Sequence, residues 1–181
     1  MNEIIYLIIK SFYFILPAYI ANMSPVIVKK LRILEFPLDF KIKIKNKRIL
    51  GEHKTIRGLI SGIIGGILVA FIQNYLTKFE FFTNLSIINY DSWILIGFLM
   101  GFGAIFGDAI ESFIKRQLNI KPGKALVLWD QIDFIIGAIL FISIIEKINI
   151  LIILTTIIIS PLLTVIINHI SYYLKIRGEK W

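Results

Sequence analysis

Phe102-Gly-Ala-Ile-Phe-Gly-Asp-Ala-Ile-Glu-Ser-Phe-Ile-Lys-Arg116 carries an apolar block directly into a segment with charges of both signs. A second charged segment, Trp129-Asp-Gln-Ile-Asp133, also adjoins a long apolar stretch. Charged side chains at the depth of a membrane are costly and usually serve a function. The sequence therefore predicts a membrane protein with a polar site at the edge of the hydrocarbon, and its mixture of carboxylates with Lys and Arg suits a metal-bound phosphate.

Hydrophobic residues make up 57% of the 181 residues, well above the share in an ordinary globular chain. Several apolar blocks in a chain of this length predict one integral membrane domain over residues 1–181. The first block lacks a small-residue cleavage site, so we expect no cleavable signal peptide. The absence of cysteine excludes disulfides, cysteine-ligated zinc and iron–sulfur clusters.

A membrane-spanning helix needs roughly 20 apolar residues. Four blocks approach that length: Ile4–Ala21, Leu59–Leu76, Ile87–Phe106 and Ile148–Ile167. A fifth block, Ile132–Ile145, would measure only about 21 Å as a helix, against a hydrocarbon thickness of roughly 30 Å. We expect this helix to begin earlier, near Ala125–Asp130, which draws Asp130 and Asp133 into the membrane edge. The predicted fold is an all-α polytopic membrane protein with about five transmembrane helices.

The formal net charge of +8 is suited to binding nucleic acid, anionic lipid or an anionic substrate, and the distribution of the charge decides among them. Ten Lys and Arg residues lie between the first and second spans, four between the third and fourth, and three after the fifth. The positive-inside rule then places the N-terminus outside and the C-terminus in the cytoplasm. Topology thus explains most of the basic excess, so we expect a multi-pass protein of the cell membrane and no nucleic-acid partner.

Two local patterns predict further structure. Small residues recur four positions apart in the second span (Ser61/Gly65, Gly62/Gly66) and the third (Gly97/Gly101, Gly103/Gly107), which is typical of close helix packing. In the first cytoplasmic loop, Lys41-Ile-Lys-Ile-Lys45 alternates basic and apolar residues. This alternation predicts either a short strand or an interfacial segment that lies on anionic headgroups.

The charged end of the third span predicts one candidate site. If residues 107–116 continue the helix, the side chains of Asp108, Glu111, Ser112 and Lys115 share one face, and Arg116 lies beside them. A carboxylate, a hydroxyl and two cations on one face can hold a divalent ion and neutralise phosphate oxygens. The alternative is a solvated, salt-bridged helix next to the membrane.

Asp130 and Asp133 form a second pair of carboxylates, one helical turn apart at the start of the short fourth span. They could simply respond to the helix macrodipole. Burial of two unpaired carboxylates would be costly unless a cation joins them. Magnesium fits such hard oxygen ligands, whereas zinc does not, because His53 and His169 lie far apart in the sequence.

A third group lies just before the second span, where Gly51, Lys54, Thr55 and Arg57 occur within seven residues. They supply close backbone approach, a hydroxyl and two cations, which are enough to hold a polyphosphate at a helix N-terminus. The alternative is ordinary basic flanking of a transmembrane helix. All three groups fall on the predicted cytoplasmic side, where a site could take a nucleotide from water and a lipid phosphate from the bilayer.

At these segments the chain resembles the archaeal CDP-archaeol synthase family, relatives of the bacterial phosphatidate cytidylyltransferases. The matching segments follow the family order over essentially the whole chain: Pro17–Asn22, Pro37–Asp39, Gly51–Gly58, Gly107–Arg116, Pro122-Gly123 and Asp130–Asp133. The family pattern has proline immediately before the Asp-Gln pair, where this chain has Trp129.

The resemblance implies an enzyme that transfers a cytidylyl group from CTP to an unsaturated archaeal ether-lipid phosphate, 2,3-bis-O-geranylgeranylglycerol 1-phosphate. It implies Mg²⁺ as the cofactor and pyrophosphate as the second product. Asp108, Asp130 and Asp133 would surround the metal with Ser112 nearby. The phosphates would be held by Lys54, Arg57, Lys115 and Arg116, and the nucleotide by Gly51 and Thr55. The competing interpretations are a small transporter or channel for an anionic solute and a structural membrane subunit.

Overall fold

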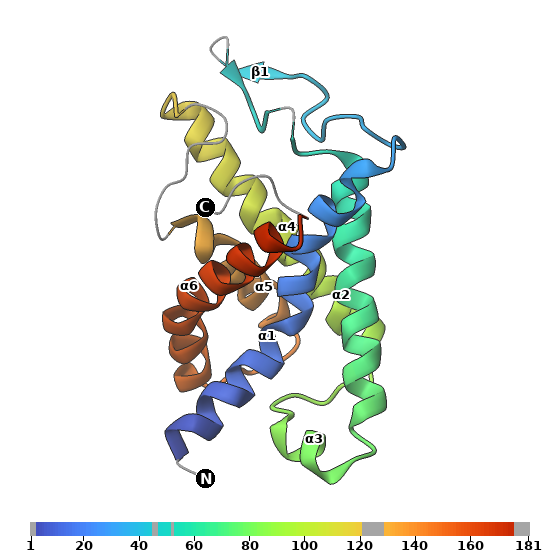
Figure 1. Cartoon of the computed structure of the whole chain (residues 1–181), viewed down its shortest axis with the longest axis vertical. Helices are drawn as coiled ribbons and strands as arrows, with labels where there is room; N and C mark the ends of the chain where they lie inside the picture. Colours follow the sequence, from blue (N-terminus) through green and yellow to red (C-terminus); the bar gives the residue numbers. More distant parts are fainter. Residues whose placement is uncertain (1–2, 45–46, 52, 121–128, 176–181) are drawn as a thin grey trace.

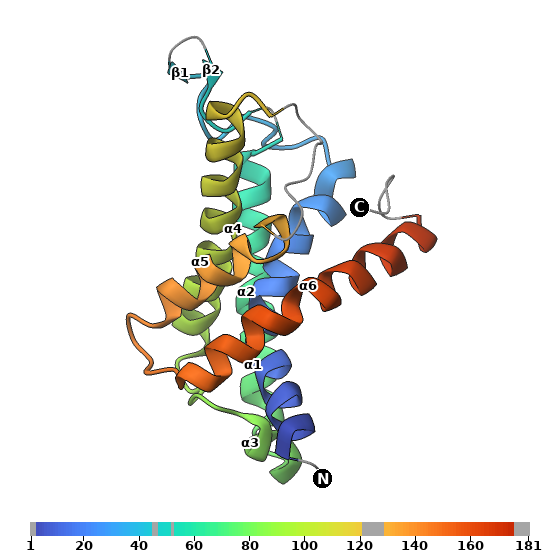
Figure 2. The same cartoon turned by 90° about the vertical axis from the view of Figure 1, so that its left-hand side faces the viewer.

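The computed structural model of this chain describes residues 3–44, 47–51, 53–120 and 129–175. These residues form an all-α bundle with a small two-stranded hairpin at one end (Figures 1 and 2). The α-helices are α1 (Glu3–Ile27), α2 (Ile56–Leu76), α3 (Glu80–Leu85), α4 (Trp93–Gln117), α5 (Asp133–Ile142) and α6 (Ile150–Tyr173). Two short 3₁₀ turns, η1 (Val28–Lys30) and η2 (Trp129–Gln131), follow α1 and precede α5.

Four helices in the described part of the chain are long and apolar enough to cross a membrane: α1 with η1, α2, α4 and α6. They correspond to the first, second, third and fifth predicted spans, so the all-α multi-pass membrane fold is confirmed. The third span begins later than predicted, at Trp93 rather than Ile87, because the short helix α3 and an irregular segment precede it. At its other end this helix continues to Gln117, as the charged face predicted.

The prediction for the fourth span was wrong in its bounds. Instead of Ile132–Ile145, α5 covers ten residues, or about 15 Å, and among the described residues before it 129–131 form a 3₁₀ turn rather than α-helix. The Asp133 carboxylate accepts the N–H of Phe134 at 2.6 Å. Such a local bond between side chain and backbone favours a helix start over a helix interior. The rest of the expected earlier start, Ala125–Leu128, lies outside the described residues.

Helix α4 is the centre of the bundle and packs against α1, α2 and α5. Glycines let its backbone touch two neighbours directly. A Cβ built on Gly66 of α2 would lie 2.9 Å from the Cα of Gly101, and one on Gly103 would lie 3.0 Å from the Cα of Ala138 in α5. The close packing predicted from the small-residue pattern is therefore confirmed, and it brings the start of α5 against the middle of α4.

Helix α1 joins α5 and α6 through aromatic and polar contacts in the core. The rings of Tyr19 and Phe134 meet edge to face with their centroids 5.1 Å apart. The Tyr19 hydroxyl also donates to the backbone carbonyl of Ser160 at 3.3 Å. Such ring pairs add to the stabilisation that burial provides. They fix α1 against the same end of α5 that carries Asp133.

The first loop, which we define as the chain between η1 and α2, contains the hairpin of β1 (Lys43–Ile44) and β2 (Lys47–Arg48). The strands are antiparallel, with Lys43 opposite Arg48. The short strand predicted from the alternating residues is thus confirmed. Figures 1 and 2 show the hairpin at the same end of the molecule as the last turns of α4, with α3 at the opposite end.

Candidate active site

Three carboxylates from two helices converge at the α4–α5 contact. Asp108 and Glu111 lie one turn apart on α4, and Asp133 is the first residue of α5. Each offers one oxygen, and these oxygens lie within 4.8 Å of one another. We call these residues the acidic cluster. Glu111 and Asp133 are buried and Asp108 is half-buried, so the cluster is largely withdrawn from bulk water.

The position of Asp133 depends on the absence of a side chain at Gly107. A Cβ there would lie 2.9 Å from the carbonyl carbon of Asp133, a separation too short for packed atoms. Because residue 107 is glycine, the N-terminal end of α5 can lie directly on α4. This contact sets the carboxylate of Asp133 beside those of Asp108 and Glu111.

Two lysines connect the acidic cluster to the surrounding chain. Lys54, from the first loop, forms an ion pair with Asp108. Lys115, one turn after Glu111 on α4, forms ion pairs with Glu111 and, at 2.6 Å, with Asp130 of η2. The structure thus brings together residues from all three groups that the sequence singled out.

The charges of this arrangement do not cancel. Asp108, Glu111, Asp130 and Asp133 contribute four negative charges when ionised, against two positive charges from Lys54 and Lys115. Buried charge of one sign is costly, so a site with this imbalance favours a divalent cation. Carboxylate oxygens are the ligands that Mg²⁺ prefers, and the donor set therefore fits that ion.

Arg116 extends the site toward the first loop. Its Nε is buried and has no hydrogen-bond partner among the residues that the structure describes. Its side-chain Cδ would lie 3.9 Å from a Cβ built on Gly51. Gly51 has a φ of +91°, a left-handed conformation that glycine adopts without strain. A guanidinium beside a half-buried backbone turn is suited to phosphate oxygens.

Asp39 organises the part of the first loop that faces Arg116. Its carboxylate accepts hydrogen bonds from Arg48 at 3.0 and 2.6 Å and from the amides of Leu50 and Gly51 at 3.1 and 3.3 Å. Burial alone would raise the pKa of Asp39. The bonds from Arg48 and from the backbone amides outweigh burial and lower the pKa from 3.8 to about 2. Asp39 is therefore an ionised anchor that holds the turn at Gly51.

Two predicted nucleotide-binding residues have structural contacts of their own. The Thr55 hydroxyl accepts the N–H of Gly58 at 3.2 Å and caps the start of α2. Arg57 donates to the backbone carbonyl of Leu31 and pairs with Glu35 at 3.1 Å. These contacts fix the two ends of the first loop to α2, so the structure gives Thr55 and Arg57 a role in the shape of the loop.

Sequence reasoning placed Glu111 on the candidate face without assigning it to the metal, and it gave no role to Asp39. Glu111 shares its helix face with Asp108, one turn away, and this spacing was the available signal for the cluster. Asp39 belongs to one of the family segments, although no role followed from it. Asp130, predicted beside the metal, pairs with Lys115, as Glu111 does, and is not one of the three residues of the acidic cluster. Ser112 is buried on α4, at a helical position that shares the face of Asp108 and Lys115.

The fold and the site together define a polytopic membrane protein with an acidic, lysine-bridged centre at one end of its bundle. The family model described as "CarS-like: CDP-archaeol synthase" matches residues 4–181. The chain therefore belongs to the CDP-archaeol synthase family, as the resemblance in its motifs implied.

Individual relatives agree with the family match over nearly the full length. The chain is 36% identical to the CDP-archaeol synthase of Methanocaldococcus jannaschii, covering 97% of this chain and 98% of that one. It is 35% identical to the CDP-archaeol synthase of Archaeoglobus fulgidus with the same coverage.

A solved structure, described as an intramembrane enzyme for archaeal membrane lipids biosynthesis, is similar with a TM-score of 0.71 and 26% identity. The similarity covers 87% of this chain and 91% of that one. The protein is thus a membrane enzyme of archaeal lipid biosynthesis. The comparisons give no support to the alternative of a transporter or channel.

Proposed function

We propose that the protein transfers a cytidylyl group from CTP to 2,3-bis-O-geranylgeranylglycerol 1-phosphate, giving a CDP-activated lipid and pyrophosphate. The observation that carries this proposal is the acidic cluster, whose three carboxylate oxygens lie within 4.8 Å of one another beside two lysines. The relatives named above carry the name of a CDP-archaeol synthase, which supports the same reaction here.

The reaction requires little acid–base chemistry from the protein. A phosphate oxygen of the lipid attacks the α-phosphorus of CTP and forms a new P–O bond. The bond from that phosphorus to the oxygen shared with the β-phosphate breaks, and its electrons leave with pyrophosphate. Because the lipid phosphate is already a nucleophile, the site needs only to align the two phosphates and to offset their charge.

Lys54, Lys115 and Arg116 would align the two phosphates and offset their charge. In the present arrangement Lys54 and Lys115 are held by carboxylates, so both ammonium groups are already positioned at the acidic cluster. Asp130 also pairs with Lys115 and so helps to orient its ammonium group. The Nε of Arg116 has no hydrogen-bond partner within the described part of the chain. Arg116 would therefore bind a phosphate that lies beside the acidic cluster.

Asp108, Glu111 and Asp133 would hold Mg²⁺, and Asp130 remains a proposed further ligand in place of its bond to Lys115. Bound there, the ion would neutralise charge on the phosphate oxygens and on the pyrophosphate leaving group. Ser112 would complete the polar face of α4. The first loop would hold the nucleotide: Gly51 through its backbone, and Thr55 and Arg57 either directly or through the shape that they give to the loop.

The positive-inside distribution supports a site on the cytoplasmic side, where CTP is available. The first loop carries Lys54, which pairs with Asp108 of the acidic cluster, and it also carries the largest group of basic residues. Lysines on its hairpin would attract an anionic lipid headgroup from the surrounding membrane.

Release of pyrophosphate by the purified protein in detergent tests this function. The assay contains CTP, MgCl₂ and the geranylgeranyl-glycerol phosphate, with an EDTA sample and Asp133→Asn beside it. Asp91→Asn is the matched control, because this exposed aspartate lies at the opposite end of α4. We expect release that requires CTP, lipid and metal, persists in Asp91→Asn and is lost in Asp133→Asn. Absence of release from well-folded wild-type protein would overturn the proposal.

A further inference from the structure

A second feature of α4 lies on the side of the helix that does not carry the carboxylates. An apolar groove of about 290 Å³ runs along it. Its lining comes from the first loop, α2 and α4, and every described residue in it is apolar: Leu38, Ile49, Leu50, Leu59, Phe102, Ile105, Phe106, Ala109, Ile110 and Phe113.

The groove follows a helical stripe of α4. Phe102, Phe106, Ala109 and Phe113 recur at the spacing that places side chains on one face. At about 100° per residue, this stripe lies more than a third of a turn from the face of Asp108 and Lys115. Arg116 falls between the two faces. A phosphate held by Arg116 would therefore stand at the end of the groove and beside the acidic cluster.

The first loop covers the groove and also places Lys54 at the acidic cluster. The N–H of Leu38 donates to the carbonyl of Lys54 at 2.8 Å, and the N–H of Leu50 donates to the Asp39 carboxylate at 3.1 Å. Lys54 then reaches Asp108 with its side chain. The groove and the acidic cluster thus share the first loop and α4.

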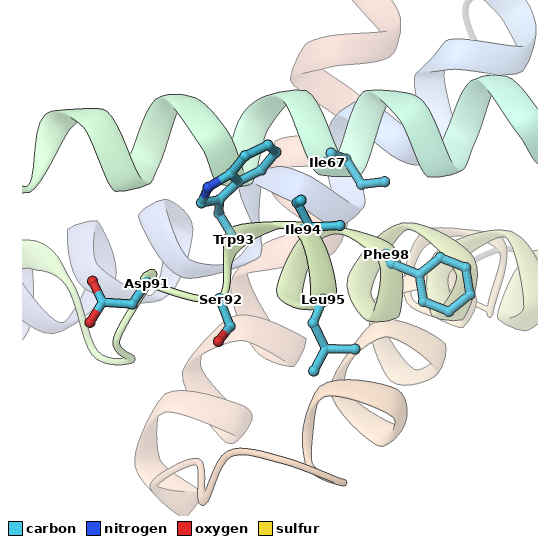
Figure 3. A pocket seen from close by; sticks show the side chains of 7 residues that line it. All are labelled: Ile67, Asp91, Ser92, Trp93, Ile94, Leu95 and Phe98. Carbon is cyan, nitrogen blue, oxygen red and sulfur yellow. The ribbon is translucent and has the colours of Figure 1, made fainter.

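A second cavity on α4 lies much farther from the acidic cluster than the groove does. This cavity, of about 370 Å³, lies at the beginning of α4. It is lined by Ile67, Asp91, Ser92, Trp93, Ile94, Leu95 and Phe98 (Figure 3). Neither Lys nor Arg is among these residues. Trp93 lies fifteen residues before Asp108, or about 22 Å along the helix. A glycerol phosphate headgroup in that cavity would therefore lie far from the acidic cluster.

We propose that the groove binds the part of a prenyl hydrocarbon chain of the lipid phosphate that lies next to the glycerol, with the phosphate at Arg116. This assignment rests on the proposed function and adds the place of the substrate's chain. The residues of the groove offer no hydrogen-bonding side chains, so they select a hydrocarbon, and three phenylalanines shape the space. Phe106 and Ile110 are exposed at its edge and leave it open toward the surrounding lipid.

Photocrosslinking tests the location without relying on turnover. The probe is a geranylgeranyl-glycerol phosphate with a diazirine on the first prenyl unit of one chain, and crosslinked peptides are identified by mass spectrometry. We expect label on the α4 residues of the groove and on Leu50, with loss of that label when unlabelled lipid phosphate, but not a neutral prenyl glycerol, is added. Label spread equally over α6 and unaffected by competition would mean surrounding bilayer lipid only and would overturn the proposal.

A kinetic comparison separates this proposal from the reaction itself. Ala109→Trp fills the groove, whereas Leu95→Trp makes a change of similar kind at the distant cavity of Figure 3. We expect Ala109→Trp to lower kcat/KM for the geranylgeranyl substrate about tenfold or more and to leave the KM for CTP unchanged. Leu95→Trp should match wild type.

If Ala109→Trp does not fold, the milder variant Phe113→Leu replaces it. We expect Phe113→Leu to lower kcat/KM for the geranylgeranyl substrate by a smaller factor. Wild-type activity with unchanged kinetics in a folded groove variant would overturn the groove assignment alone. An inactive, folded wild type would instead overturn the proposed function, so the two failures are distinguishable.

Discussion

Gly107 of α4 and Asp133 of α5 touch through their backbones, so closely that a Cβ on Gly107 would lie 2.9 Å from the carbonyl carbon of Asp133. The acidic cluster depends on this contact, because it sets how far the Asp133 carboxylate stands from Asp108 and Glu111. A displacement of one ångström at a catalytic site can cost a large part of the rate.

Gly107→Ala should therefore reduce turnover while the bundle stays helical. The added methyl pushes the start of α5 away from α4, and we expect kcat for pyrophosphate release to fall by about a hundredfold. Gly65→Ala is the control, since its methyl meets the end of the Ser24 side chain, which can rotate away. Circular dichroism should show helical spectra for both variants. Equal activity of Gly107→Ala and wild type would contradict the positioning role.

Asp133→Asn should stabilise the metal-free protein and abolish its response to Mg²⁺. Removal of one buried negative charge from the acidic cluster relieves repulsion, so Tm in EDTA should rise. Wild-type Tm should increase on addition of MgCl₂, because an ion that binds only the folded state stabilises it. Thermal unfolding in detergent with and without MgCl₂ measures both effects. An equal Mg²⁺-dependent increase in the variant would show that Asp133 is not part of the ion site.

Lys115→Met should destabilise the protein, because Glu111 and Asp130 would lose the cation between them. Loss of one partner from a buried ion pair costs about 3 kcal/mol or more. Adding Glu111→Gln to this variant should recover part of the lost stability and none of the activity. Chemical unfolding of the single and double variants tests the coupling. Purely additive effects would show that the Lys115–Glu111 pair contributes no energy of its own.

The first loop should loosen in acid. The pKa of Asp39 is about 2 in the folded protein against an ordinary value of 3.8. A lowered pKa stabilises the loop above about pH 4, and this stabilisation of roughly 2 kcal/mol is lost as the pH falls toward 2. The protection factor of the Leu50 amide, whose N–H the Asp39 carboxylate accepts, should fall over that range when it is taken relative to the intrinsic exchange rate at each pH.

Asp39→Asn is the matched control for that measurement. It keeps the shape of the side chain and removes the charge, so the protection factor of the Leu50 amide should be lower at neutral pH and nearly independent of pH between 2 and 4. A wild-type profile in the variant would show that another group controls the loop.

The sequence was sufficient for the long helices because their signal is local. An apolar run of the required length that continues into Asp108, Glu111 and Lys115 at helical spacing predicts α4 without any knowledge of its neighbours. The glycine pairs likewise predicted close packing, and the alternation from Lys41 onward predicted a strand or an interfacial segment, of which the structure shows a short strand.

The composition of the acidic cluster was less accessible, because it depends on contacts between distant parts of the chain. Whether Glu111 or Asp130 joins Asp108 and Asp133 is decided by how far α5 is displaced along α4. That displacement follows from the backbone contacts at Gly103 and Gly107. No local sequence pattern indicates how far α5 is displaced along α4. For the same reason the ten residues of α5 looked like the interior of a longer helix.

The first loop shows a second limit. A cluster of Thr55, Arg57 and glycines has the composition of a phosphate-binding segment, and composition cannot tell such a role from capping and loop closure. Thr55 caps α2, and Arg57 pairs with Glu35 across the loop. Both contacts require partners whose position only the folded chain defines.

The glycine contacts around α4 also determine which parts of the enzyme can move. Where backbones touch at Gly66 and Gly101, and again at Gly103 and Gly137, no side chains lie between the helices to repack into a second arrangement. Rotation or sliding of α4 would open empty space in its two closest contacts. Among the described residues, α2, α4 and α5 therefore form the fixed part of the site, and the first loop is a part that can move without breaking these glycine contacts.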